Sequence, residues 1–182
     1  MLDHQGTKKI ETQRLLLRKY CESDAADIFK NYASDEEVTR FLPWEPYENV
    51  EDVKLFISSQ LANDSIRAYN WVISYGGEVT GSISVTSLNE QNESCEIGYC
   101  LGRAFWNQGI LSEALAAVVA FLFGEVSFHR VMAKHDVENP ASGRVMQKCG
   151  MVYEGRLREH YRRRDGSFAD AQVYGLLKQE AL

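Results

Sequence analysis

The sequence predicts a mixed α/β fold in which a mostly antiparallel sheet contains one parallel pair of strands and is flanked by helices. Two observations carry this prediction. Strand patterns joined by glycine-containing turns occur in the first half of the chain and at its end, which favours antiparallel hairpins. Between them, a strand pattern, a long apolar helix and another strand pattern follow one another, which is the order of a βαβ unit.

In the N-terminal part, residues 10–20 predict a strand because a run of three leucines lies between two arginines. Apolar side chains then recur at helical spacing over residues 24–33 and again over residues 51–61, so each segment predicts a helix. A shorter apolar cluster between the two helices is ended by Pro43 and Pro46, because proline interrupts regular structure.

The middle of the chain predicts three strands and a buried helix. Residues 69–75 and 78–88 are strand patterns separated by Gly76-Gly77, which is a strong hairpin signal. Residues 94–101 alternate in polarity and predict a further strand. Residues 112–123 are almost wholly apolar, which indicates a helix that is covered on most sides.

The C-terminal part predicts strand, helix and hairpin in that order. Residues 131–137 read as a strand, and residues 140–149 as a helix that ends at a glycine. Residues 151–161 and 168–177 are strand patterns joined by a turn that contains Asp165-Gly166. Arg156, Arg158 and Arg162 are expected on one face of this hairpin, either as a solvated face or as a local attraction for an acidic peptide, RNA or CoA phosphates.

Length and composition indicate one folded domain. The chain has 182 residues, of which 45% are hydrophobic and 25% charged, as in ordinary globular proteins. We expect a loose lead-in over residues 1–9 and a single domain over residues 10–182. The net charge of -6 argues against nucleic acid as a partner, and no segment predicts a leader or a membrane span. The expected location is therefore cytoplasmic, with the four cysteines as free thiols.

No metal site is expected from the cysteines and histidines. Cys95 and Cys100 are five residues apart on a predicted strand, so their side chains point to opposite faces. His129 and His135 share a face but lie about 20 Å apart along an extended chain. Both histidines are expected at the surface or with their hydrogen bonds satisfied.

The junction over residues 106–114 lies between a predicted strand and the apolar helix. Backbone N–H groups at a helix start are unpaired, and the helix dipole favours an anion there. Gly109 would allow a close approach to that backbone. The segment has neither a GxGxxG motif nor a GKS/T phosphate loop, so the residues alone leave open a phosphate site and an ordinary helix cap.

Four motifs in sequence order resemble the GNAT superfamily of acyl-CoA-dependent N-acetyltransferases, and within it the RimJ/RimL-type branch of ribosomal-protein N-terminal acetyltransferases. The resemblance covers residues 10–178. It rests on the segments Glu11-Thr12-Gln13-Arg14-Leu15-Leu16-Leu17-Arg18, Glu96-Ile97-Gly98-Tyr99 with Phe105-Trp106-Asn107-Gln108-Gly109, Asn139-Pro140-Ala141-Ser142, and Lys148-Cys149-Gly150-Met151.

The resemblance implies a GNAT-like acyl-CoA N-acyltransferase fold, with acetyl-CoA as cosubstrate and no metal. The strands at residues 96–101 and 131–137 would be parallel neighbours that splay apart. Leu111 replaces a small residue of the family's loop, and its bulk would crowd the pyrophosphate or shift the helix start. Backbone contacts to the pantetheine and acetyl group are implied for Tyr99, Cys100 and Leu101, and contacts to the pyrophosphate for Asn107, Gln108, Gly109, Ile110, Leu111 and Ser112.

The resemblance also implies roles for side chains near the thioester. Ser142 would protonate the departing thiolate, although it could be only a polar residue in the first helical turn. Asn139 would bond the pantetheine chain, and as the residue before Pro140 it also suits a helix N-cap. Glu96 would deprotonate the acceptor amine directly or through water; the alternative is a carboxylate that faces solvent or pairs with an arginine.

Phe41 and Trp44 belong to an aromatic cluster between the first two helices, where the resemblance places a lid that shapes the substrate site. Plain packing is the alternative for both side chains. Glu113 follows the loop and is expected to be a structural carboxylate stabilised by the helix dipole.

The resulting functional prediction is an N-acetyltransferase that moves the acetyl group directly to a primary amine in a ternary complex. The amine could belong to a protein N-terminus, such as that of a ribosomal protein, or to a small molecule, and a homodimer is possible in this family. A non-catalytic acyl-CoA-binding or regulatory module on the same fold, and a nucleotide-binding regulator, are the competing hypotheses.

Overall fold

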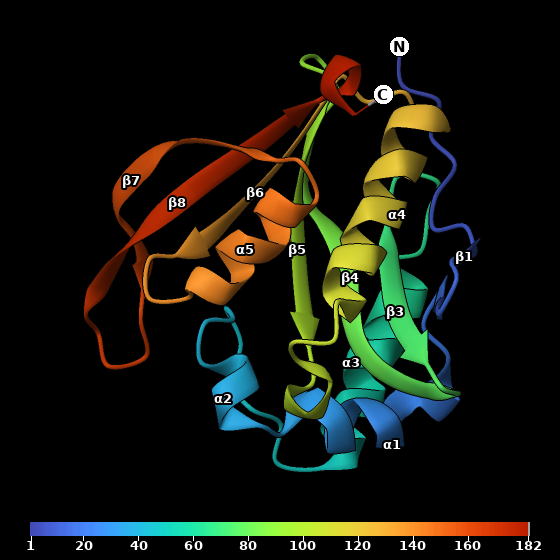
Figure 1. The fold of residues 1–182 in the computed structure, drawn as a ribbon. Coiled ribbons are helices and arrows are strands. Elements are labelled where there is room, and N and C mark those ends of the chain that lie inside the picture. Colours follow the sequence, from blue (N-terminus) through green and yellow to red (C-terminus); the bar gives the residue numbers. More distant parts are fainter. Residues whose placement is uncertain (182) are drawn as a thin grey trace.

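The computed structural model describes residues 1–181 and contains one 8-stranded sheet with the order β1-β2-β3-β4-β5-β6-β8-β7 (Figure 1). All neighbouring strands are antiparallel except β5 and β6, which are parallel. The strands are β1 (Ile10–Glu11), β2 (Leu15–Arg18), β3 (Asn70–Tyr75), β4 (Glu78–Asn89), β5 (Ser94–Leu101), β6 (Arg130–Asp136), β7 (Val152–Arg162) and β8 (Phe168–Leu177).

The helices cover both faces of the sheet. Helices α4 and α5 lie on one face, and α1 and α3 lie on the other (Figure 1). None of the helices in residues 1–181 combines the length and apolarity needed to cross a membrane. Their bounds are α1 (Ala25–Ile28), α2 (Glu36–Thr39), α3 (Val50–Ala62), α4 (Ile110–Gly124) and α5 (Pro140–Lys148).

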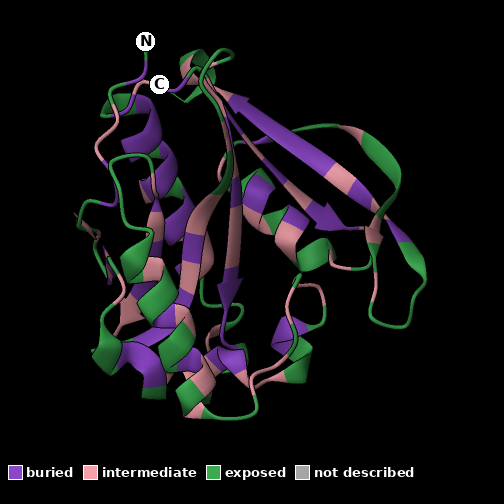
Figure 2. Ribbon diagram, turned by 180° about the vertical axis from the view of Figure 1, so that it is seen from behind, coloured by how far each residue is buried: buried purple, intermediate pink, exposed green. Residues whose placement is uncertain are grey.

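Two apolar clusters lie on opposite faces of the sheet, as the alternation of β5 predicts. Cys95 and Ile97 belong to the cluster beneath α4, whereas Cys100 belongs to the cluster beneath α1 and α3. The two cysteines therefore face opposite ways, as expected from their odd spacing. Helix α4 is buried along most of its length, while β7 is exposed along nearly all of its length (Figure 2).

The parallel pair β5–β6 is joined only at one end. Ladder partners run from Ser94 with Arg130 to Glu96 with Met132. Beyond this point the rest of β5 pairs only with β4, and the rest of β6 pairs only with β8. Figure 1 shows the two strands diverging toward the end of β5. The predicted splay is therefore present, and it leaves backbone polar groups on both strands without a partner from the neighbouring strand.

Three local features differ from the predicted elements. The first predicted strand is a short hairpin, β1 and β2, because the Thr12 hydroxyl accepts from the Leu15 N–H and closes a turn. The first predicted helix continues from α1 into a π-helical turn over Phe29–Ala33. In β7, the register shifts between Leu157 and Tyr161, so the simple alternation expected from Arg156 to Arg162 is interrupted.

Residues 1–9, expected to be a loose lead-in, contact the body of the protein instead. Leu2 is buried in the apolar cluster beneath α4, and the Asp3 N–H donates to the Val126 carbonyl. The Trp71 indole donates to the Lys8 carbonyl at 2.7 Å. These partners lie far along the chain, so the local sequence pattern carries no signal for them.

Candidate active site

Helix α4 begins directly after the loop that follows β5, beside the open end of the splayed strands (Figure 1). Gly109 caps the helix with φ of +75°, and Asn107 has φ of +60°. The Glu113 N–H is the first to bond back along the helix, to the Gly109 carbonyl. The N–H groups of Gly109, Ile110, Leu111 and Ser112 therefore have no partner within the helix and present donors to an anion.

Side chains hold this loop in place. The Trp106 indole donates to the Leu101 carbonyl at 2.7 Å, and the Gln108 amide donates to the Ala104 carbonyl at 2.9 Å. The guanidinium of Arg14 donates to the Gln108 carbonyl at 3.0 Å. Of the three residues expected to contact pantetheine through their backbone, Leu101 thus already has its carbonyl engaged within the protein.

Leu111 does not displace the helix start. Helix α4 begins at Ile110, directly after the Gly109 cap. The Leu111 side chain is half-buried and packs against the apolar cluster on this face of the sheet. Part of the bulk expected to crowd an anion is therefore directed into the core.

Glu113 is a structural carboxylate that ties the first hairpin to α4. One oxygen accepts from the Thr12 hydroxyl at 2.6 Å, and the other accepts from Arg14 Nε at 2.7 Å. Burial by itself would raise the pKa of Glu113, but the hydrogen bonds from Thr12 and Arg14 outweigh it and lower the pKa below the ordinary value of 4.5.

The lowered pKa of Glu113 makes a pH-dependent contribution to stability. The contribution is complete above the unfolded value of about 4.5 and is lost as the pH falls through the lower folded value. We expect Glu113→Gln to reduce the free energy of unfolding at pH 7, and the difference from wild type to shrink below pH of about 4.5. Urea denaturation at several pH values measures this. A difference that does not change with pH would contradict it, and Glu48→Gln, an exposed loop carboxylate, is the control.

Tyr99 and Ser142 connect β5 to α5. The Ser142 hydroxyl donates to the Tyr99 hydroxyl at 3.0 Å, and the Tyr99 hydroxyl donates to the Ser142 carbonyl at 3.1 Å. Removal of the phenol from water raises the pKa of Tyr99, so it remains protonated at neutral pH. Only backbone contacts were expected for Tyr99, and the local sequence carries no signal for this hydroxyl pair.

Helix capping positions Ser142. Asn139 is the N-cap of α5, and its side-chain oxygen accepts from the Ser142 N–H at 3.3 Å. Pro140 follows at the first helical position, where its missing N–H costs no hydrogen bond. The capping reading of Asn139 is thus confirmed, and it places Ser142 in the first turn of the helix, facing β5.

Glu96 lies on the opposite face, at the last rung of the parallel ladder. Its carboxylate pairs with the Lys134 ammonium at 3.1 Å, and both side chains are about one-fifth exposed. The partner is therefore a lysine, where the alternative reading expected an arginine or solvent. Burial raises the pKa of the Tyr161 phenol, and the negative charges of Glu96 and Asp136 add to this increase.

The aromatic residues between α2 and α3 take different positions. Trp44 stacks on Tyr47 with ring centroids 5.6 Å apart, and it packs against the apolar cluster beneath α1 and α3. Trp44 also lines a cleft of about 340 Å³ that faces the turn between β7 and β8. Phe41 does not line this cleft; its ring lies 5.0 Å from the Arg40 guanidinium.

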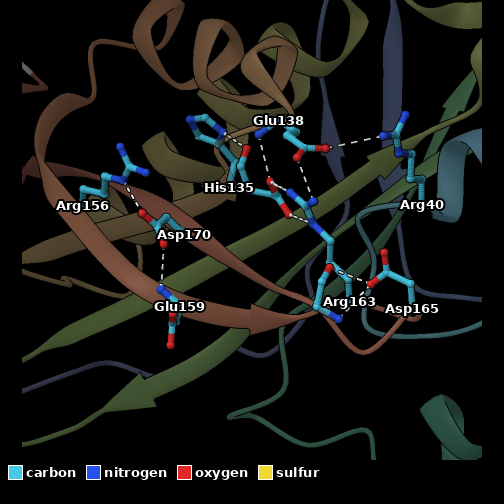
Figure 3. A network of polar contacts seen from close by, with 10 residues as sticks. Arg40, His135, Glu138, Arg156, Glu159, Arg163, Asp165 and Asp170 are labelled. Carbon is cyan, nitrogen blue, oxygen red and sulfur yellow. Dashed lines mark hydrogen bonds and ion pairs between the residues drawn. The ribbon is translucent and has the colours of Figure 1, made fainter.

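A polar network follows the end of β6 (Figure 3). The buried carboxylate of Asp136 accepts from Arg163 at 3.0 and 3.2 Å, and Arg163 also pairs with Glu138 at 2.7 Å. His135 is buried, with Nδ1 2.8 Å from the Asp136 carbonyl. Its Nε2 lies against Gly143 and has no hydrogen-bond partner among residues 1–181, so the expectation of a satisfied histidine is wrong for this nitrogen.

The described residues contain no group of three or more histidine, cysteine, aspartate and glutamate side chains placed to hold a metal ion. The splayed strands and the α4 N-terminus bring together hydroxyls, a carboxylate and backbone amides.

Comparisons with known proteins agree with this geometry. A family model described as the acetyltransferase (GNAT) domain matches residues 14–152. The chain is 32% identical to the uncharacterized N-acetyltransferase p20 of Bacillus licheniformis, over 93% of this chain and 96% of that protein. It is 34% identical to the ribosomal-protein-serine acetyltransferase of Escherichia coli, over 45% of this chain and 46% of that protein.

Among solved structures, RimL, a ribosomal L7/L12 alpha-N-protein acetyltransferase in complex with coenzyme A, superposes with a TM-score of 0.84. The superposition covers 93% of this chain and 98% of that chain, at 23% identity. The superposition shows that the two chains share a fold.

Proposed function

Because the chain belongs to the GNAT acetyltransferase family and is an acetyl-CoA-dependent acetyltransferase, we propose that it transfers the acetyl group directly to a primary amine in a ternary complex. The single observation that carries the proposal is the hydroxyl pair of Tyr99 and Ser142 at the splayed strands. This pair would supply a neutral proton donor to a thioester bound at the gap, where the backbone groups have no partner from the neighbouring strand.

The α4 N-terminus and the splayed strands suit the two ends of acetyl-CoA. The unpaired N–H groups of residues 109–112 would bind the diphosphate, with the helix dipole adding to the attraction. The free backbone groups of Tyr99 and Cys100 would pair with the pantetheine amides, since the ladder to β6 has ended there. Both parts of the site are polar backbone, so no side-chain nucleophile is required.

The transfer forms a bond between the amine nitrogen and the acetyl carbon, and it breaks the bond between that carbon and sulfur. The amine has to lose a proton, and the leaving thiolate has to gain one. Ser142 would turn its hydroxyl away from Tyr99, donate its proton to the thiolate and regain a proton from solvent. The neutral Tyr99 phenol would donate a hydrogen bond to the transient alkoxide and would keep its own proton. Glu96, directly or through water, would take the proton of the amine.

The acceptor that we propose is an amine at a protein or peptide N-terminus. Relatives named as ribosomal-protein acetyltransferases support this class, although their similarity to the chain is partial in length or below 25% identity. A small-molecule amine is the second class to test. The proposed roles of Tyr99 and Ser142 concern the thioester and do not depend on the rest of the acceptor molecule.

A thiol-release assay tests the proposed function. Protein and acetyl-CoA are incubated with N-terminal peptides, a lysine peptide with a blocked N-terminus, a polyamine and an aminoglycoside. We expect thiol release above background with at least one free N-terminal amine, and little with the same peptide after N-terminal blocking. Binding of CoA without thiol release for any amine would instead support a non-catalytic acyl-CoA-binding module.

A further inference from the structure

The cleft of about 340 Å³ between the α2–α3 loop and the β7–β8 turn is large enough for a small ligand group. Trp44 and Pro43 form one wall, and three consecutive arginines, Arg162, Arg163 and Arg164, form the other. The only carboxylate in its lining is Glu45. The cleft thus has an aromatic residue on one side and three arginine residues on the other.

Two of the three arginines form ion pairs with carboxylates of the protein. Arg164 pairs with Glu45 at 2.9 Å and donates to the backbone carbonyls of Thr39 and Trp44 at 2.8 and 2.9 Å, which ties the hairpin turn to the α2–α3 loop. Arg163 turns inward to Asp136 and Glu138. Both charges are therefore balanced by carboxylates of the protein itself.

Arg162 is different, because its exposed side chain has no carboxylate partner within the described part of the chain. Once the other lining charges are paired, the cleft keeps one positive charge that is available to a ligand. A guanidinium presents a planar pair of donors that matches a carboxylate or a phosphate. An anionic group is the ligand chemistry that this wall would bind.

A short series of hydrogen bonds links the wall of the cleft to the helix that carries Ser142. Arg163 in the cleft wall binds Asp136 at the end of β6. The Asp136 carbonyl accepts from the Asn139 N–H at 2.8 Å, and Asn139 caps the helix that carries Ser142. A ligand long enough to span these three successive contacts would reach from the cleft toward Ser142.

We propose that the cleft is an acceptor subsite in which Arg162 binds an anionic group, a carboxylate or a phosphate, located near the reactive amine. This inference rests on the proposed function, since it names the acceptor class of that same site. It selects acceptors with an acidic side chain close to a free N-terminus over otherwise identical neutral ones.

The test compares Arg162→Gln with wild type on matched peptides. Peptides with a free N-terminal serine carry aspartate, asparagine, phosphoserine or serine at the second or third position. We expect wild type to favour the anionic member of each pair in kcat/KM by about tenfold, the magnitude of one charge-assisted hydrogen bond. Arg162→Gln should remove this preference by raising KM for the anionic peptides, with KM for acetyl-CoA unchanged.

Arg158→Gln is the matched control, because it removes the same charge from an exposed position on β7 outside the cleft. Equal turnover of anionic and neutral peptides by wild type would overturn the inference while leaving the proposed function intact. An equal loss of preference in Arg158→Gln would also overturn it, because the effect would then come from overall charge. A lack of thiol release from every peptide would instead count against the proposed function. Comparison of the aspartate peptides with the phosphoserine peptides shows whether the cleft binds a carboxylate or a phosphate.

Discussion

Replacing Ser142 by alanine is expected to lower kcat by about 100-fold or more and to leave KM for acetyl-CoA nearly unchanged, because general acid catalysis contributes on this scale. The hydroxyl lies 3.0 Å from the Tyr99 hydroxyl, in the first turn of α5. The mutation removes the proposed proton donor without changing the helix cap, since the Asn139 side-chain oxygen accepts from the backbone N–H of residue 142. Steady-state kinetics with acetyl-CoA and the best peptide acceptor measure both parameters.

The partner variant Tyr99→Phe sharpens this prediction. If the two hydroxyls act as one unit, Tyr99→Phe lowers kcat to a similar extent, and the double variant is little worse than either single variant. Ser59→Ala, on an exposed part of α3, is the matched control and should retain wild-type kcat. An unchanged kcat in Ser142→Ala, or fully additive losses in the double variant, would remove the pair from the mechanism.

Asp136→Asn is expected to reduce the free energy of unfolding by about 3–5 kcal/mol, the usual cost of breaking a buried ion pair by removing one charge. The Asp136 side chain is 6% exposed, and it binds the Arg163 guanidinium through both oxygens. It also accepts from the Glu138 N–H at 2.8 Å, which shapes the loop that leads into α5. Urea denaturation at pH 7 measures the loss.

The matched control for Asp136→Asn is Asp170→Asn on the neighbouring strand β8. Asp170 pairs with Arg156, whose side chain is 59% exposed, so this pair should contribute no more than about 1 kcal/mol. Equal losses in the free energy of unfolding for the two variants would contradict this prediction. Burial of the Asp136–Arg163 pair would then add nothing to its contribution. Loss of the pair should also loosen the β7–β8 turn, because Arg163 connects that turn to the end of β6.

The regular elements could be predicted because their signals are local. The Gly76-Gly77 turn is found at the end of β3, and the uninterrupted apolar run becomes α4, which is buried along most of its length. The alternation of β5 also placed Cys95 and Cys100 on opposite faces. Each of these features depends on spacing within one segment, which the sequence displays directly.

The missed features depend on partners that are distant in sequence. Tyr99 meets Ser142 only because β5 and α5 meet in space, and Trp106 reaches the Leu101 carbonyl through a turn that its motif does not specify. The contacts of residues 1–9 with β3 and with the end of α4 have the same origin. The ion-pair partner of Glu96 could not be predicted from the sequence either. Lys134 lies on β6, and the short parallel ladder sets the register of that strand against β5.

A crystal structure of the complex with CoA tests the central claim most directly. We expect the diphosphate to accept hydrogen bonds from the backbone of residues 109–112, the pantetheine to lie between β5 and β6, and the sulfur to lie beside the hydroxyls of Tyr99 and Ser142. CoA bound elsewhere on the protein would contradict this account. So would a continuous ladder between β5 and β6 that closes the gap beyond Glu96.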